Sequence, residues 1–203
     1  MPKLKIYGIS GSRAIRSLWA IEETGEAYEH IPVSYKDDSK TDEYLAVNPN
    51  GKVPSLTDGD VTLFESMAIN LYLAKNYARD LYPDEPATEA QILQWTVWGI
   101  SEIEPLQMPI VVQKFFVPDE KRNEKLIASS QKQLLRPLKT LDDHLKGRDW
   151  LVGEAFTIAD LNLSAVMMLL QMVEYDYSSF AEVSRWASAC YERPALVRAR
   201  QLP

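Results

Sequence analysis

The feature that most constrains the fold is a change of residue pattern near position 85. Over the first 80 residues, strand-like and helix-like segments alternate, whereas almost no strand signal remains after Thr88. The segment between the two regions, RDLYPDEP at residues 79–86, is charged and contains two prolines, which is typical of a linker. We therefore predict an α/β domain over residues 1–80, a linker over residues 81–87 and an all-α domain over residues 88–203.

The first domain contains four segments with the pattern of strands and two with the pattern of longer helices. The strands are expected at Leu4–Gly8, Tyr28–Tyr35, Lys52–Thr57 and Val61–Phe64, and the helices at Arg13–Thr24 and Ser66–Tyr77. The initial strand–helix–strand order predicts a parallel pair of strands with a right-handed crossover. Asp58-Gly59 predicts a hairpin, because glycine adopts positive φ without a steric penalty. The expected result is a mixed four-stranded sheet with helices packed on it.

The second domain shows helical patterns only. Long helices are expected over residues 88–117 and 119–147, with shorter helices over residues 157–172, 180–192 and 194–200. Pro105, Pro109 and Pro137 fall inside the long helices. We expect these prolines to end or kink them, because proline lacks an amide hydrogen and clashes with the preceding turn.

Composition excludes several classes of protein. With 46% hydrophobic and 25% charged residues, the chain resembles an average globular protein. Its net charge of −7, without a basic tract, argues against nucleic-acid partners, because phosphate binding needs clustered Lys or Arg. The longest apolar run, residues 165–170, is far below the ~20 residues of a membrane span, and the N-terminal apolar run is too short for a secretory signal. With a single Cys and no membrane segment, we expect a cytoplasmic protein.

Common catalytic motifs are missing from the sequence. There is no G-x-G-x-x-G, no P-loop and no C-x-x-C, and the two histidines, His30 and His144, lie far apart in the chain. We therefore expect no metal site and no Ser-His-Asp triad. The lone Cys190 falls in a late helix, where such a residue is typically buried. Any thiol chemistry would have to use a thiol supplied by the ligand.

Three short segments remain as candidate sites. Ser10-Gly11-Ser12-Arg13 precedes the first helix, where hydroxyls either cap the helix or stabilise an anion such as a thiolate. Pro54 begins a strand, either as an ordinary entry proline or after a cis bond that would present the Val53 backbone to a peptide ligand. Glu65-Ser66 opens another helix, either as a simple cap or as a site where helix amides bind a carboxylate and Glu65 binds an ammonium.

Together these segments resemble the cytosolic glutathione transferase family. The resemblance covers nearly the whole chain. In the first domain it rests on YGISGSRAIRSLW, NPNGKVPSL and LFESMAINLYL, which begin at Tyr7, Asn48 and Leu63. In the second domain FTIADL and WASACYERPAL also match, and Thr157-x-x-Asp160 has the spacing of a helix capping box. The resemblance implies a thioredoxin-like glutathione-binding domain followed by an all-α domain.

The resemblance also implies roles for individual residues. Pro54 matches the family's cis-proline, and Val53 would pair through its backbone with the cysteinyl part of glutathione. Glu65 and Ser66 match the pair that binds the γ-glutamyl end. Lys52 lies where family members often have a polar or basic residue near the glycyl carboxylate.

The resemblance leaves the residue that activates the thiol open. Family members use a Tyr at the end of the first strand, or a Ser or Cys in the following loop, and the lone Cys of this chain is in the wrong domain. Tyr7 fits the tyrosine type by spacing, while Ser10 and Ser12 lie in the loop but Gly11 falls about where the serine types place their hydroxyl. Arg13 either favours the thiolate or forms a structural ion pair.

The function implied is conjugation of glutathione, as co-substrate, to small apolar electrophiles in detoxification, by positioning and thiolate stabilisation in a homodimer. The electrophile pocket is expected between the two domains, with the all-α domain forming its wall. Candidates for that wall are Trp95, Trp98, Met108, Phe115 and Phe116, which could equally belong to the core or to a dimer interface. The alternatives are a non-catalytic interaction or stress module of the same fold, or a glutathione-dependent peroxidase or isomerase. The first alternative would be marked by loss of Pro54, Glu65 and Ser66, which are all present.

Overall fold

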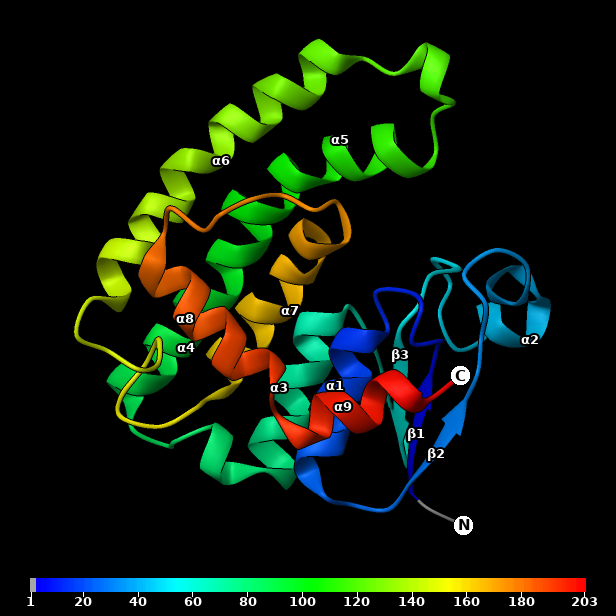
Figure 1. Ribbon diagram of the computed structural model, residues 1–203. Helices are drawn as coiled ribbons and strands as arrows, with labels where there is room; N and C mark the ends of the chain where they lie inside the picture. Colours follow the sequence, from blue (N-terminus) through cyan, green and yellow to red (C-terminus); the bar gives the residue numbers. More distant parts are fainter. Residues whose placement is uncertain (1–2) are drawn as a thin grey trace. The chain divides into compact units, whose positions relative to one another are not determined.

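A computed structural model describes residues 3–203 (Figure 1). Residues 1 and 2 of the expected first domain lie outside the described residues. The described chain folds into two compact units. The first runs to Asp84 and also contains Glu192–Pro203, and the second is Glu85–Tyr191. We expected residues 88–203 to form one domain. The segment from Glu192 belongs instead to the first unit, because helix α9 (Pro194–Gln201) packs on helix α1 (Ile15–Thr24).

The first unit is built on a mixed sheet, as the sequence predicts. Within residues 3–203 the sheet has four strands, in the order β2-β1-β3-β4. They are β1 (Leu4–Tyr7), β2 (Tyr28–Ile31), β3 (Ser55–Asp58) and β4 (Val61–Phe64). β2 is parallel to β1, and β1, β3 and β4 are antiparallel neighbours. β2 and β3 are shorter than expected, because Pro32 and Pro54 have no amide hydrogen to contribute to the sheet.

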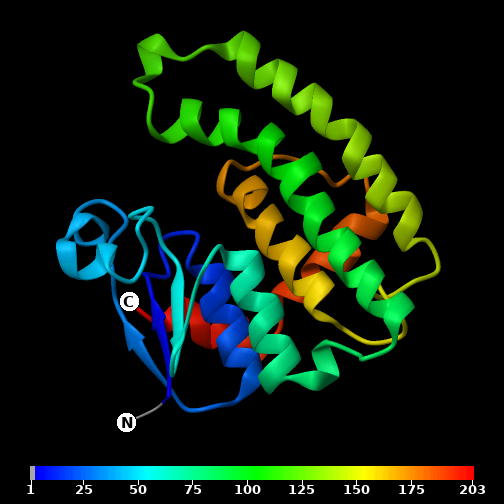
Figure 2. The same ribbon diagram turned by 180° about the vertical axis from the view of Figure 1, so that it is seen from behind.

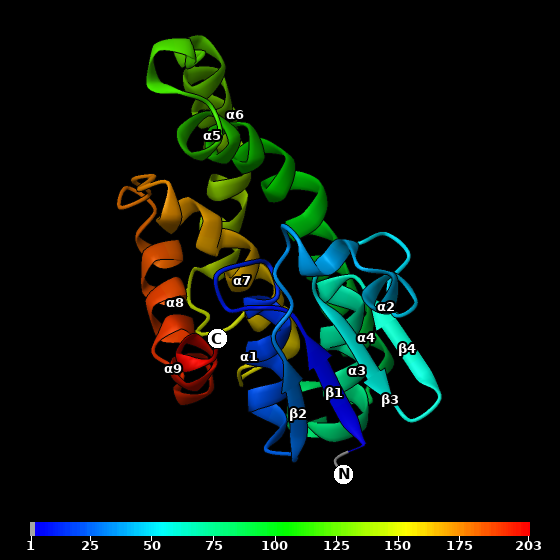
Figure 3. The same ribbon diagram turned by 90° about the vertical axis from the view of Figure 1, so that its right-hand side faces the viewer.

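Helices cover both faces of this sheet. α1 and α3 (Ser66–Tyr77) lie side by side on one face (Figure 3), and the short α2 (Asp42–Leu45) lies on the opposite side (Figure 1). Short helical turns occupy Asp38–Lys40 and Arg79–Leu81. The core between sheet and helices is apolar. Its fully buried side chains are those of Ile6, Leu18, Trp19, Ile21, Leu56, Ile69 and Leu73.

The strand register brings three connections to the same edge of the sheet. Tyr7, at the end of β1, is opposite Ser55, at the start of β3, and Ser55 is opposite Phe64, at the end of β4. The loop after Tyr7, the dipeptide before Ser55 and the dipeptide after Phe64 therefore lie next to one another. Each is one of the three candidate segments of the sequence.

The second unit is helical throughout its described residues. Figure 2 shows α5 and α6, in green and yellow-green, running side by side. The helices are α4 (Pro86–Trp98), α5 (Glu104–Phe115), α6 (Glu124–Leu145), α7 (Ile158–Met172) and α8 (Ala181–Tyr191). A π-helical turn, Gly99–Ile103, interrupts the first expected long helix just before Pro105, and a short turn, Asp119–Lys121, precedes α6. Pro109 and Pro137 lie inside α5 and α6 without ending them.

The capping box predicted at Thr157 and Asp160 is confirmed at the start of α7. The Asp160 carboxylate accepts hydrogen bonds from Thr157 N and Oγ1, at 2.9 and 3.0 Å. It also accepts from Leu151 N at 2.8 Å and from Trp186 Nε1 at 2.9 Å. One buried carboxylate thus joins the start of α7 to the preceding loop and to α8. Among the helices of residues 3–203, none is both long enough and apolar enough to cross a membrane.

Candidate functional site

The candidate site is the row of loops at the edge of the sheet where Tyr7, Ser55 and Phe64 lie in register. The loop from Gly8 to Ala14 is packed closely against the segment before β3. A Cβ atom built on Gly8 would lie 2.3 Å from Ala14 Cβ and 3.3 Å from Val53 Cβ, and Gly8 has φ +136°. Only glycine fits this position, and its close approach brings the start of α1 next to Val53.

The hydroxyls of this loop have different partners. Ser12 Oγ donates to Ile9 O at 2.7 Å and accepts from Ala14 N at 3.1 Å, so it caps the first turn leading into α1. Ser10 Oγ donates to Leu202 O at 2.7 Å. Ser10 is therefore bonded to the backbone after α9, whereas Ser12 lies at the positive end of the α1 dipole.

Among the described residues, Tyr7, unlike the two serines, is held by a ring contact and not by a hydrogen bond of its hydroxyl. Its ring is half-buried and packs against the ring of Tyr44, with 6.0 Å between ring centroids. Its hydroxyl makes no hydrogen bond within residues 3–203. Tyr7 is thus held by its ring while its hydroxyl is available to a ligand.

The segment before β3 has the conformation that the family resemblance implies. The Val53–Pro54 peptide bond is cis, and Pro54 is buried. The preceding carbonyl, Lys52 O, accepts hydrogen bonds from Tyr44 Oη and from Asn48 Nδ2, each at 2.7 Å. These contacts fix the backbone that leads to Val53, while the Lys52 side chain is exposed.

The dipeptide after β4 is strained at its first residue. Glu65 has φ 71° and ψ 113°, a region that a residue with a Cβ rarely occupies. It immediately precedes α3 and its side chain is exposed. Ser66, the first residue of α3, is 8% exposed, and its hydroxyl makes no hydrogen bond within residues 3–203. An exposed carboxylate, an available hydroxyl and the first amides of a helix are thus placed together.

Two residues of this edge were not identified from the sequence. The Tyr44 hydroxyl donates to Lys52 O at 2.7 Å and accepts from Ser55 Oγ at 2.8 Å, and burial raises the pKa of this phenol. Lys40 Nζ donates to Gly51 O. The ammonium of Lys40 therefore lies at the residue that precedes Lys52. Neither has a local motif. Their only signal is that they precede NPNGKVPSL by a few residues.

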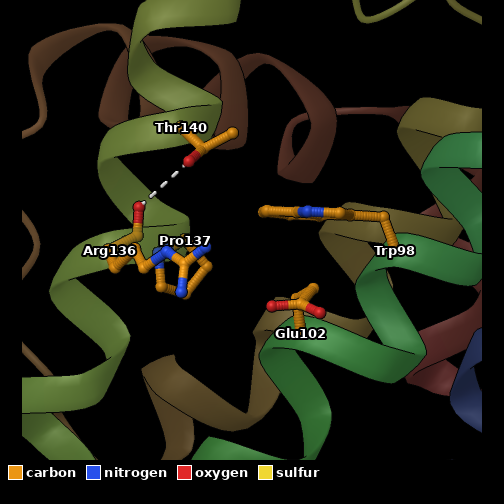
Figure 4. Close-up of a pocket in the computed structure, with 5 residues that line it drawn as sticks. All are labelled: Trp98, Glu102, Arg136, Pro137 and Thr140. Atoms are coloured by element: carbon orange, nitrogen blue, oxygen red, sulfur yellow. Dashed lines mark hydrogen bonds between the residues drawn. The ribbon is translucent and has the colours of Figure 1, made fainter.

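The second unit contains a cavity of about 290 Å³ between α4 and α6 (Figure 4). Trp98 points across it toward α6, and the charged side chains of Glu102 and Arg136 line it together with Pro137 and Thr140. Of the other expected wall residues, Trp95 is buried and packs against the tilted ring of His144, with 4.5 Å between ring centroids, whereas Phe115 and Phe116 are exposed. The electrophile pocket itself stays a prediction. Within residues 3–203, no group of three or more His, Cys, Asp or Glu is placed to hold a metal ion.

Comparison with known protein families gives two matches along the chain. The model described as "Glutathione S-transferase, N-terminal domain" matches residues 2–75, and "Glutathione S-transferase, C-terminal domain" matches residues 104–194. Together they cover most of the sequence.

Individual relatives match over almost the full length. Glutathione S-transferase 4 of Zea mays is 32% identical over 98% of this chain and 93% of its own. Glutathione S-transferase GstB of Escherichia coli K12 is 29% identical over 98% of this chain and 99% of its own. The theta class glutathione S-transferase of Xanthomonas axonopodis pv. citri, solved with glutathione bound, has a TM-score of 0.91 and 31% identity over 100% of this chain and 99% of its own.

Proposed function

Because this chain belongs to the glutathione S-transferase family, we propose that it joins the sulfur of glutathione to small apolar electrophiles. The chain is a glutathione transferase, and the electrophile class and the roles of individual residues are the proposal. The observation that supports it most is the register of Tyr7, Ser55 and Phe64, which starts all three candidate segments at one edge of the sheet.

In the proposed complex, glutathione lies along this edge as an extended peptide. The backbone of Val53 pairs with the cysteinyl residue, and Pro54 keeps that backbone turned toward the ligand. Glu65 binds the ammonium of the γ-glutamyl end, while Ser66 and the first amides of α3 bind its carboxylate. Lys52 attracts the glycyl carboxylate, supported by the charge of Lys40.

Ser12 is proposed as the group that stabilises the thiolate. It lies at the N-terminus of α1, where the helix dipole favours an anion, and the positive charge of Arg13 adds to this effect. The Ser12 hydroxyl would turn from Ile9 O to donate to sulfur. The second candidate is Tyr7, because its hydroxyl has no hydrogen-bond partner within residues 3–203.

The reaction needs no covalent enzyme intermediate. The thiol loses its proton to solvent, and the sulfur lone pair forms a C–S bond to the electrophilic carbon. A leaving group departs with the electron pair of its bond, or, in an addition, the adjacent carbon takes up a proton. The protein contributes by positioning the sulfur and by stabilising its charge.

Retention on immobilised glutathione, combined with a conjugation assay on a chlorinated aromatic substrate, tests the proposed activity. We expect binding at millimolar glutathione and release of chloride. Binding without conjugation would favour the non-catalytic module, and peroxide or isomerase substrates would then be assayed. Failure to bind glutathione would contradict the proposal.

The activating group is tested by the pH dependence of kcat/KM in Ser12→Ala and Tyr7→Phe. Loss of the true donor should raise the apparent pKa of bound glutathione by about one unit, since one hydrogen bond to a charged sulfur is removed. If neither variant changes that pKa, the proposed stabilisation of the thiolate is wrong.

We also propose that the protein is a homodimer, as members of this family generally are. Leu93, Val97 and Ile100 form an exposed apolar stripe along α4 and the turn that follows it. A second copy would cover this stripe. Val97→Asp should then give a monomer in sedimentation velocity, whereas Gln91→Asp, an exposed change on the same helix, should leave the mass unchanged. A dimeric Val97→Asp would place the interface elsewhere.

A further inference from the structure

The last segment of the described chain is anchored along α1. Arg193 binds Glu23 through Nε and Nη2, at 2.5 and 2.7 Å, and the Glu23 side chain is 8% exposed. Arg198 Nε binds Glu22 Oε2 at 2.6 Å, and Arg198 Nη2 donates to Glu22 O at 2.9 Å. These ion pairs fix α9 on α1, so the backbone that follows α9 is held in a defined place.

That backbone reaches the loop before α1. After α9 ends at Gln201, Leu202 is extended, with φ −70° and ψ 152°. Leu202 O accepts from Ser10 Oγ at 2.7 Å, and Pro203 O accepts from Ser10 N at 2.8 Å. We call this pair of contacts the Ser10 clamp. It joins segments that are 192 residues apart in the sequence.

One peptide group connects the Ser10 clamp to Ser12. The amide hydrogen of the Ile9–Ser10 peptide is donated to Pro203 O. The carbonyl of the same peptide accepts from Ser12 Oγ at 2.7 Å and from Ser12 N at 3.1 Å. Because a peptide group is rigid and planar, holding its N–H also fixes the direction of its C=O. The backbone after α9 therefore sets the position of the group to which Ser12 is bonded.

We infer that Ser10 and the carbonyls of residues 202 and 203 form a positioning element for the thiolate site, acting through the Ile9–Ser10 peptide. This inference rests on the proposed role of Ser12. Ser10 is then a positioning residue, not the thiol-activating group, because its hydroxyl is already used by Leu202 O. Release of the clamp would let the loop from Gly8 to Ala14 move and would weaken stabilisation of the sulfur without removing any group that touches glutathione.

Two variants release the clamp in different ways. Ser10→Ala removes the hydroxyl contact, and a chain that ends at Gln201 removes both acceptor carbonyls. Ser10→Ala should lower kcat/KM for conjugation about fivefold near neutral pH, as expected for one lost hydrogen bond, and the shortened chain should lower it at least as much, because it loses both contacts. Each should also raise the apparent pKa of bound glutathione, read from the pH profile and from the ultraviolet absorbance of the thiolate. Combining them should add little, because both break the same connection.

Further variants separate positioning from general destabilisation. Ser10→Thr keeps the hydroxyl and should retain most of the activity that Ser10→Ala loses. Val197→Ala changes an exposed side chain of α9 and should leave the pH profile unchanged. Thermal unfolding of every variant shows whether the fold is intact.

The outcomes distinguish this inference from the proposed function. If Ser12→Ala raises the pKa of bound glutathione while the shortened chain and Ser10→Ala do not, the positioning element is disproved and the proposed function stands. If Ser12→Ala leaves that pKa unchanged, the proposed role of Ser12 fails, and the inference fails with it. If Ser10→Ala and the shortened chain both raise the pKa and Ser10→Thr restores it, the clamp is supported.

Discussion

At the scale of single residues, the backbone of Glu65 and the carboxylate of Asp58 have measurable consequences. Glu65 is held at positive φ beside the site. Asp58 lies at the opposite edge of the sheet, where its Oδ1 pairs with Lys3 Nζ at 3.0 Å and its Oδ2 accepts from the hydroxyls of Tyr72 and Tyr77. The strained backbone of Glu65 lowers the stability of the fold but places this residue at the site. Asp58 joins the β3–β4 hairpin to α3.

Glu65→Gly should separate strain from binding. Glycine adopts φ 71° freely, so relief of strain should exceed the added entropy of the unfolded chain and stabilise the protein by about 1 kcal/mol. The same change removes the carboxylate proposed to bind the ammonium of glutathione, and KM for glutathione should rise roughly tenfold or more. Urea unfolding and steady-state kinetics measure the two effects. An unchanged KM would show that Glu65 does not bind the γ-glutamyl end.

Asp58→Asn should destabilise the protein in a pH-dependent manner. Burial alone would raise the pKa of Asp58, but hydrogen bonds from Tyr77 and Tyr72 and the charge of Lys3 together lower it. In turn, the hydrogen bond to Asp58 and burial raise the pKa of each phenol to about 12. At neutral pH the loss should be about 2 kcal/mol.

The sign of the pH effect follows from the lowered pKa. A carboxyl whose pKa is lower in the folded state adds stability above its ordinary value of 3.8, and this contribution is lost as the pH falls through the folded value. The difference between the original protein and Asp58→Asn in urea unfolding should therefore shrink below pH 3.8. Asp60→Asn, an exposed change on the same hairpin, should cost less than about 0.5 kcal/mol at any pH. A pH-independent difference would contradict the charged state of Asp58.

Individual site residues could be predicted from the sequence only where they belong to a distinctive short motif. Pro54 and Ser66 stand in short segments whose residue order is itself distinctive. Tyr44 and Lys40 do not, because each acts on a backbone carbonyl of the segment 51–52, and any residue offers a carbonyl. The partner of Ser10 could not be predicted either, since it is a backbone group 192 residues away.

At the scale of elements, the loop between β1 and α1 depends on its first glycine. The end of a helix was predicted well where a glycine marks it, as for α1, which ends at Thr24 before Gly25 with φ 69°. The face that α3 buries is less evident from the sequence. Its fully buried side chains are Ile69, Asn70 and Leu73. α3 is apolar on most sides, so helical spacing alone cannot select the face that meets the core.

Gly8→Ala and Gly11→Ala form a matched pair within this loop. At Gly8 the new Cβ would meet Ala14 Cβ at 2.3 Å in a backbone conformation with φ +136°, and we expect a loss of about 3 kcal/mol or more. At Gly11 a Cβ meets nothing within 4 Å, and the change should be within about 0.5 kcal/mol of neutral. Denaturant unfolding of both variants checks this. Equal stabilities would mean that the loop can open without cost.

At the scale of the whole molecule, the first unit is discontinuous in sequence. Residues up to Asp84 are completed by Glu192–Pro203, and the helical unit is inserted between them. The helical pattern at residues 194–200 was visible in the sequence, but a pattern gives the type of an element and not its neighbour. The partners of Arg193 and Arg198 are ordinary glutamates of α1, which no local signal distinguishes from the chain's other carboxylates.

A double-mutant cycle on Glu23→Gln and Arg193→Gln measures how strongly the two parts of the first unit are joined. The contact is bidentate and largely shielded on the Glu23 side, so we expect a coupling energy of about 1–2 kcal/mol in urea unfolding. The exposed pair Lys139 and Asp143 on α6 serves as control and should give about 0.3–0.5 kcal/mol. Equal coupling in both cycles would show that the Arg193–Glu23 pair adds no more than an exposed pair to the attachment of α9.

The insertion of the helical unit also has a consequence during protein synthesis. The strands and α1 leave the ribosome first, but the segment that bonds to Ser10 follows only after Glu85–Tyr191 has been translated. At ordinary elongation rates those roughly 110 residues take about 5–20 s. For that interval the nascent sheet unit lacks α9, and the surface of α1 that α9 later covers is exposed to solvent and to chaperones.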